Sequence, residues 1–186
     1  MTPDFEELYR LFKSRAEAAA AEVHRVKDIR EAGELLTTLV KESGTTKVAA
    51  APSRLVAKCL AGVSLPVPVY TEDLRTHAEE AHLGLSEMDL AVADIGSLQQ
   101  DCTDINQRLV SMLPQVHVAL VKTGSLVADL KEAFERLAQQ KDRFPGYISF
   151  ITGPSRTADI ERVLTIGVHG PSQLKIIFID EPGGDT

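Results

Sequence analysis

Three apolar runs in the second half of the chain constrain the fold more than any other feature of the sequence. Residues 115–121, 147–151 and 174–179 each have the length and the branched or aromatic side chains of a β-strand. In the last two runs nearly every position is apolar, which is typical of strands buried on both faces. Such strands occur in parallel sheets covered by helices on both sides, so the runs predict the interior sheet of an α/β protein.

The remaining segments alternate between helical and strand-like patterns. Helices are predicted at residues 3–26, 29–41 and 53–60, and from Ser125 until the pattern frays at residues 139–142. Further strands are predicted at residues 48–51, 67–70 and 88–93. Pro68 indicates that the second is weak and lies at a sheet edge or in an irregular position, whereas residues 71–85 indicate mixed loop and helix. This order favours an α/β fold with a largely parallel sheet flanked by helices. We expect an N-terminal helical segment (1–44), an α/β domain (45–181) and a mobile tail (182–186).

Composition excludes several classes of function. The chain has 186 residues and a formal net charge of −7, which disfavours a nucleic acid partner. There is no cationic and apolar leader at the N-terminus and no apolar run of about 18 residues, so we expect a cytoplasmic protein without a membrane span. Phosphate-binding, dinucleotide-binding and nucleophile-elbow glycine motifs are absent from the sequence.

The cysteines and histidines do not form a metal motif. Cys59 and Cys102 lie far apart and outside any cluster-type spacing, so two buried free thiols are the expected state. His77 and His82 are five residues apart, which places them about 140° apart around a helix instead of on one face. We therefore expect no metal site and no cofactor in this chain.

Residues 151–171 offer the best candidate for a ligand site. The order of residues indicates a strand, a glycine turn, a short helix, a second glycine turn and a strand, and ligands of open α/β sheets bind at turns beyond the carboxyl ends of strands. A small anion could be held by backbone amides, hydroxyl groups and one guanidinium. The predicted ligand-binding residues of this segment are Thr152, Gly153, Ser155, Arg156, Asp159, Glu161, Gly167 and Gly170. Between the last two glycines, His169 is a candidate acid or base near neutral pH.

A second turn could complete this site. Asp94, Gly96 and Ser97 follow the predicted strand at 88–93, and a carboxylate before a glycine at the end of a strand is a plausible catalytic position. We predict Asp94 as a second catalytic candidate, and Gly96 and Ser97 as ligand-binding residues. The expectation is that Asp94, Gly96, Thr152, Arg156 and His169 line one cleft.

Three blocks of the sequence resemble the LUD-domain family, especially its lactate utilization protein C (LutC) group. They are LAVADIGS at residues 90–97, SMLPQVH at 111–117, and ITGPSRTADIE followed by GVHGP within 151–171. The resemblance implies a Rossmann-like fold similar to NagB, RpiA and the CoA transferases. It also implies membership of a three-protein system that oxidises L-lactate to pyruvate, in which the other two proteins carry iron–sulfur clusters. This chain would be the cluster-free accessory component.

Two departures from the family pattern concern the candidate site. Ile95 stands where the family usually has threonine, and Asp94 is the shorter of the two acids found there. Two other functions are compatible with the residues: a stand-alone enzyme acting on a small phosphorylated or CoA-linked metabolite, and a regulatory scaffold without a ligand. The sequence leaves open whether the chain is itself an enzyme.

Overall fold

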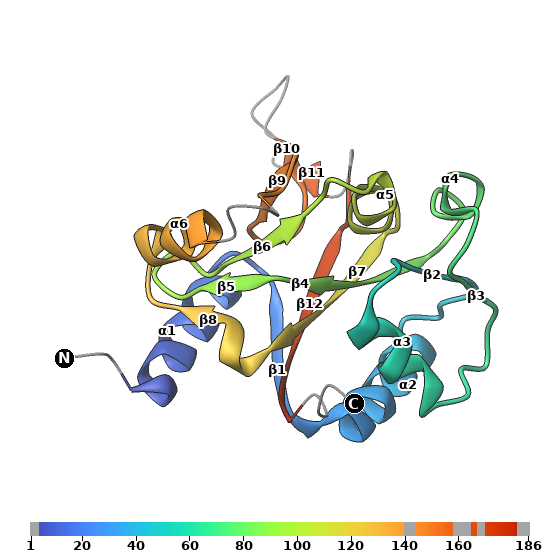
Figure 1. Ribbon diagram of the computed structural model, residues 1–186. Helices are drawn as coiled ribbons and strands as arrows, with labels where there is room; N and C mark the ends of the chain where they lie inside the picture. The colour runs from blue at the N-terminus through green and yellow to red at the C-terminus, as the bar shows by residue number, and fades with distance from the viewer. Residues whose placement is uncertain (1–3, 140–143, 158–164, 167–169, 182–186) are drawn as a thin grey trace.

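The computed structural model describes residues 4–139, 144–157, 165–166 and 170–181 (Figure 1). Its centre is a six-stranded sheet in the order β1-β12-β7-β4-β2-β3, and every neighbouring pair of strands is parallel. The strands are β1 Glu22–Asp28, β2 Val48–Ala50, β3 Val69–Tyr70, β4 Leu83–Met88, β7 Val116–Lys122 and β12 Gln173–Glu181. The prediction of a largely parallel sheet in an α/β protein is confirmed.

A second, four-stranded sheet follows the order β8-β5-β6-β9. It is formed by β5 Leu90–Val92, β6 Ser97–Asp101, β8 Leu126–Val127 and β9 Ile148–Ile151. Strand β6 pairs antiparallel with both β5 and β9, and β8 pairs parallel with β5. A short hairpin, β10 Arg156–Thr157 and β11 Thr165–Ile166, lies beyond β9.

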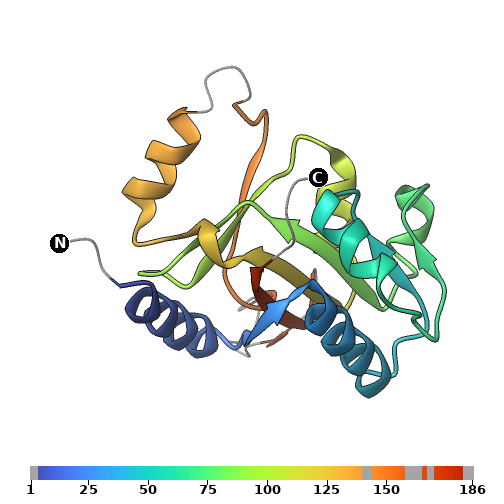
Figure 2. The same cartoon turned by 60° about the horizontal axis from the view of Figure 1, so that its bottom comes forward.

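Helices and the second sheet cover both faces of the main sheet (Figures 1 and 2). The helices are α1 Phe5–Ala18, α2 Ile29–Glu42, α3 Arg54–Ala61, α4 Leu74–His77, α5 Ile105–Met112 and α6 Leu130–Gln139, with a 3-10 turn at η1 Thr123–Ser125. Because side chains alternate along a strand, Ile177 and Ile179 of β12 pack against α2 and α3, whereas Ile176 and Phe178 pack against α1 and the second sheet. The six-stranded sheet is therefore buried on both faces.

Local sequence explains where the first helices on the sheet begin. Asp28 ends β1 and caps α2, because its carboxylate accepts a hydrogen bond from the Glu31 amide at 2.9 Å. Ser53 caps α3 by accepting a bond from the Val56 amide at 3.0 Å, directly after Pro52. Helices at residues 29–41 and 53–60 and the edge strand at 67–70 are thus confirmed, with small shifts of their ends.

The predicted helix at residues 3–26 is wrong in its second half. Helix α1 ends at Ala18, Ala20 adopts a positive φ of 65°, and β1 begins at Glu22. Val23 and Val26 fit a helical period, whereas in a strand they face opposite sides of the sheet: Val23 packs with α1 and the second sheet, and Val26 packs with the cluster of α2 and α3. Pairing with β12 over the length of β1 decides between the two. This pairing joins the N-terminal segment to the main sheet.

Two predictions around β4 are wrong in part. The mixed loop and helix predicted at residues 71–85 is confirmed up to residue 82, with α4 in it, but Leu83–Met88 is a strand that pairs with β7 along its length and with β2 over residues 83–85. Gly84, Ser86 and Glu87 weaken its apolar pattern, although every position of the strand is buried except Glu87, which is half-buried. The single strand expected at 88–93 is divided, because the chain passes from β4 into β5 at Asp89.

The last part of the chain differs from prediction in three places. Leu126 and Val127 are buried as strand β8, and the helix expected from Ser125 begins at Leu130. Strand β9 lies at the edge of the second sheet and is only half-buried, so its predicted burial on both faces is wrong. Arg156 and Thr157 pair with β11 and are strand, where a short helix was expected. Within the described residues, no helix has the length and apolar content needed to cross a membrane.

Candidate functional site

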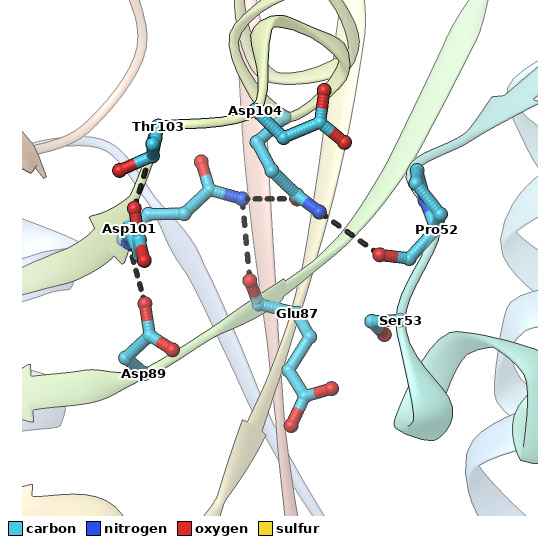
Figure 3. Close-up of a pocket in the computed structure, with 9 residues that line it drawn as sticks. Pro52, Ser53, Glu87, Asp89, Asp101, Thr103 and Asp104 are labelled. Atoms are coloured by element: carbon cyan, nitrogen blue, oxygen red, sulfur yellow. Dashed lines mark hydrogen bonds between the residues drawn. The ribbon is translucent and has the colours of Figure 1, made fainter. Parts of the chain in front are cut away.

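A cavity of about 440 Å³ opens at the carboxyl edge of the main sheet, between strands β2 and β4 (Figure 3). The chain leaves β2 towards α3 on one face of the sheet and leaves β4 towards β5 on the other face. This divergence of neighbouring parallel strands is the place where open α/β sheets bind their ligands. The topology therefore makes this cavity, which we call the edge cleft, the leading candidate site.

The walls of the edge cleft come from four parts of the chain. The lining residues are Pro52 and Ser53 before α3, Glu87 near the end of β4 and Asp89 directly after it, Gln100 and Asp101 of β6, and Thr103, Asp104 and Gln107 around the start of α5. Four of these side chains are carboxylates, so the cleft presents hydrogen-bond acceptors and negative charge to a ligand.

Two glutamines hold the walls together. The Gln100 side-chain amide donates to the Glu87 carbonyl at 3.2 Å and to Gln107 Oε1 at 3.0 Å, and Gln107 donates in turn to the Pro52 carbonyl at 3.0 Å (Figure 3). This chain of bonds links the second sheet, α5 and the loop after β2. Because Gln100 is buried and its amide nitrogen is fully used, it fixes the shape of the cleft and is not itself open to a ligand.

Backbone amides and one lysine partly neutralise the carboxylates. Glu87 pairs with Lys122 at 2.8 Å and accepts the Leu55 amide in the first turn of α3 at 3.3 Å. Asp101 accepts the Thr103 amide at 2.8 Å, and Asp104 caps α5 through the Asn106 amide at 2.9 Å.

Asp89 is the best candidate for proton transfer in the edge cleft. Desolvation raises the pKa of its carboxyl group, with a further increase from the nearby charges of Asp101 and Glu87, although the hydrogen bond from the Asp101 amide at 2.5 Å opposes this. The residue keeps solvent access, so the carboxyl group remains reachable. A carboxyl whose pKa is raised and which faces a cavity can serve as a general acid or base.

A second cavity of about 400 Å³ adjoins the edge cleft and shares Pro52 and Ser53 with it. Its lining is mainly apolar and comes from α3 and the end of β3: Ala51, Val56, Ala57, Leu60, Thr71 and Glu72. Together the two cavities suit a ligand with one apolar end and one end rich in hydroxyl or ammonium groups. Among the described residues, no three His, Cys, Asp or Glu side chains are arranged to hold a metal ion.

The residues predicted from sequence as a ligand site gather elsewhere, at the C-terminal turn of α1. Ser97 and Thr152 are joined by a hydrogen bond of 2.5 Å between their hydroxyl groups. Gly96 and Gly153 have φ angles of 61° and 67°, and a Cβ at either position would collide with the backbone of α1 or of Ala19 directly after it. Both glycines are therefore required for close packing against this turn.

Arg156 also contacts this turn, because its guanidinium donates to the Ala19 carbonyl. A cation at a helix C-terminus is favourable, which gives Arg156 a structural role in the described residues. Ser155 donates its amide to the Pro171 carbonyl at 2.8 Å, next to Gly170. Asp94 is exposed and donates its amide to the Ala128 carbonyl at 3.0 Å.

The expected location of this site at the carboxyl edge of the sheet is wrong. Strand β9, which leads into the segment, pairs antiparallel with β6 in the second sheet, and Pro171 precedes the start of β12 at the amino edge of the main sheet. Four predicted site residues lie outside the described residues: Asp159, Glu161, Gly167 and His169. Ligand binding at the remaining positions stays a prediction.

Sequence reasoning missed the acidic residues of the edge cleft. Glu87 and Asp89 are charged residues inside an otherwise apolar stretch, and that pattern could have identified the end of a buried strand. His117, in contrast, is a core histidine: it is fully buried and its Nε2 lies 2.8 Å from the hydroxyl of Ser86. Burial lowers the pKa of His117 to about 4.

Comparisons with known proteins agree with the fold. A family model described as the LUD domain matches residues 9–179. A crystal structure of a DUF162 family protein from Deinococcus radiodurans superposes with a TM-score of 0.70 at 19% identity, covering 95% of this chain and 99% of that one. This similarity shows a shared fold.

Curated relatives provide closer sequence matches. "Lactate utilization protein C" of Shouchella clausii is 36% identical over 106 residues, which cover 56% of this chain and 46% of that protein. The proteins of the same name from Macrococcus caseolyticus and Halalkalibacterium halodurans are each 34% identical, over 107 and 113 residues, covering 56% and 59% of this chain and 46% and 49% of theirs. The matched part is thus about half the length of these relatives.

Proposed function

The chain belongs to the LUD-domain family, and we propose that it acts in lactate utilization, as a cluster-free component that works with iron–sulfur proteins in the oxidation of L-lactate to pyruvate. The observation that carries the proposal is the shared name of its curated relatives, lactate utilization protein C, together with a domain match over most of the chain.

The state of the two thiols supports the cluster-free role. Cys59 is buried between α3 and its neighbours, and desolvation raises its pKa to about 11. Cys102 is buried at the end of β6, where burial raises its pKa and its thiol donates to Gln100 at 3.4 Å. Iron–sulfur clusters require thiolates that converge on one point, whereas these two groups are protonated and belong to different parts of the fold.

The charge of the edge cleft supports an accessory role. Lactate and pyruvate are anions, and the carboxylates of Glu87, Asp89, Asp101 and Asp104 would repel them. The proposal therefore assigns lactate oxidation to the iron–sulfur partners and not to the edge cleft. A small-anion site around Arg156 remains part of the proposal, because that side chain brings positive charge to the Thr152–Ser155 turn.

Deletion and complementation test the proposed role in cells. A strain without this protein, and without a second homologue, should lose lactate-dependent dye reduction and growth on L-lactate but grow normally on glucose. Wild-type protein should restore both, and Glu135→Gln, which changes an exposed carboxylate of α6, serves as the matched control. Normal L-lactate oxidation in the deletion strain would refute the proposal.

Isolation of the complex tests the partners. Affinity-tagged protein purified from cells grown on L-lactate should bring down iron-containing proteins and lactate-dependent dye reduction. Protein that elutes alone and without iron would contradict a stable complex.

The anion site has a separate test. The melting temperature of the wild type should rise with lactate, pyruvate or inorganic phosphate, and Arg156→Gln should abolish the rise. Arg30→Gln, an exposed arginine paired with Glu34 on α2, is the control that should retain it. An equal rise in wild type and Arg156→Gln would exclude Arg156 as a ligand-binding residue.

A further inference from the structure

The side chain of Gln99 is buried beneath helix α6 without a hydrogen-bond partner. Gln99 lies in the middle of β6, has no exposed surface, and neither its Nε2 nor its Oε1 has a partner among the described residues. Its register neighbours are Leu90 on β5 and Phe150 on β9, so the three side chains share one face of the second sheet. Leu90 packs in a cluster with Ala133 of α6, and Phe150 contacts Phe134 of α6. The amide is therefore enclosed between α6 and the sheet.

Helix α6 covers this amide with little apolar contact. Ala133 and Leu137 are its buried residues, whereas Phe134 is 52% exposed and Leu130 is 36% exposed. Helix α2, by comparison, buries five residues against the main sheet. A helix with few buried apolar contacts opens at a lower free energy than the core does.

The first turn of α6, in contrast, is firmly held. Asp129 accepts the Glu132 amide at 2.8 Å, and Glu132 accepts the Ala128 amide at 2.9 Å, so the two side chains cap the helix reciprocally. The carbonyls of Val127 and Ala128 accept the amides of Ala93 and Asp94 at 2.9 and 3.0 Å. The N-terminal end of α6 is thus fastened to the second sheet.

From these observations we propose that α6 is a hinged flap that pivots about its capped first turn and swings away from the four-stranded sheet, which lets water reach the amide of Gln99. Hydration of a buried unpaired amide removes its desolvation penalty, which favours the open state by about tenfold or more relative to an apolar side chain at this position. The flap is independent of the proposed function in lactate utilization.

Hydrogen exchange of the full chain, measured by mass spectrometry, tests the flap. Amides of residues 134–139 should exchange at least about tenfold faster than those of β7 and β12, because they open without unfolding of the main sheet. Gln99→Leu should slow exchange in α6 by about tenfold. Gln100→Leu is the matched control: it changes the same residue type on the same strand, but its amide is bonded on the opposite face, so it should not slow α6.

Either of two exchange rates would overturn the proposal: equal rates in α6 and in β7 of the wild type, or an unchanged rate in α6 of Gln99→Leu.

The urea dependence of exchange in the wild type gives a test that does not require Gln99→Leu to fold, and it can overturn the proposal as well. Exchange in α6 should depend weakly on low concentrations of urea, whereas exchange in β7 should rise steeply, because only global unfolding exposes a large surface. Equal urea dependence in the two elements would refute an independent flap.

Discussion

Substitution of Gly84 by alanine should destabilise the protein through a clash with helix α5. Gly84 lies in β4, and a Cβ built there would overlap the Val110 carbonyl oxygen and lie 3.2 Å from the Val110 carbonyl carbon and 3.0 Å from Pro114 Cγ. The obstacle is mainly backbone, so it cannot be relieved by rotating a side chain. Helix α5 must move away from the sheet.

The size of the effect follows from two opposing contributions. Overpacking of this kind costs up to about 3 kcal/mol, whereas replacing glycine by alanine recovers about 0.4–1 kcal/mol by restricting the unfolded chain. The net loss is about 2 kcal/mol, which corresponds to a decrease in Tm of about 4–8 °C for a domain of this size. Because α5 also carries Gln107, the same substitution should disturb the edge cleft.

Thermal and urea unfolding of Gly84→Ala measure this loss. Gly62→Ala is the matched control, since Gly62 follows α3 with an ordinary negative φ and a Cβ there has nothing within 4 Å. It should be neutral or slightly stabilising. Equal melting temperatures for Gly84→Ala and Gly62→Ala would refute the close packing of α5 on β4.

Three further predictions concern buried and charged groups. Burial lowers the pKa of His117 to about 4, so below pH 6.5 the unfolded state binds more protons than the folded state, and the free energy of unfolding should fall by up to about 3 kcal/mol between pH 6.5 and 4. In the double variant Ser86→Ala/His117→Phe, the free energy of unfolding measured with urea should depend less on pH over this range. An unchanged pH dependence would contradict the buried neutral histidine. The thiols of Cys59 and Cys102 should resist maleimide at neutral pH in the folded protein and react with it in denaturant, which mass spectrometry would measure. Rapid labelling of the native state would disprove their burial. Glu87→Gln should lower the free energy of unfolding by about 1 kcal/mol in the same assay, because the carboxylate of Glu87 pairs with Lys122 and accepts a hydrogen bond from an amide in the first turn of α3. An unaltered free energy of unfolding would mean that these contacts contribute nothing.

The central strands were the part of the fold most open to prediction from sequence. The central positions of β7 and β12, residues 118–121 and 176–179, are all apolar and buried, and a strand covered on both faces needs that composition wherever its neighbours lie. The helices α2 and α3 could be predicted as well, since their caps, Asp28 and Ser53, are local signals.

Strands β1 and β4 were not predictable from local pattern, because distant partners decide their conformation. In β1 the sequence EVHRVKD contains four charged residues at a sheet edge, and its two valines, three residues apart, fit a helical period and not one face of a strand. In β4, Gly84 weakens the strand signal, but the approach of α5 requires a residue without a side chain there. The same misassignment prevented prediction of the edge cleft, since Glu87 and Asp89 can be recognised as candidate site residues only when they are known to lie at the end of a central strand.

The glycine-rich segment shows the converse problem. Gly153 and its neighbours have the composition of an anion-binding turn, but composition does not reveal which edge of a sheet a turn occupies. Strand β9 joins a second, antiparallel sheet, and this pairing with β6 carries the turn to the end of α1. Only the three-dimensional arrangement separates this turn from the cleft at the carboxyl edge.

The position of β12 has a consequence for the order in which the molecule assembles. This last strand lies between β1, the first, and β7, so the ion pair of Glu22 with Lys175 joins residues that are 153 positions apart. On a ribosome, β1 emerges long before the strand that must pair with it, and it remains an unpaired edge until β12 has been made. Loop closure over such a span is slow, so the parallel sheet should be completed only after synthesis of β12. A ribosome-stalled chain that ends before residue 173 would therefore hold β1 accessible to protease.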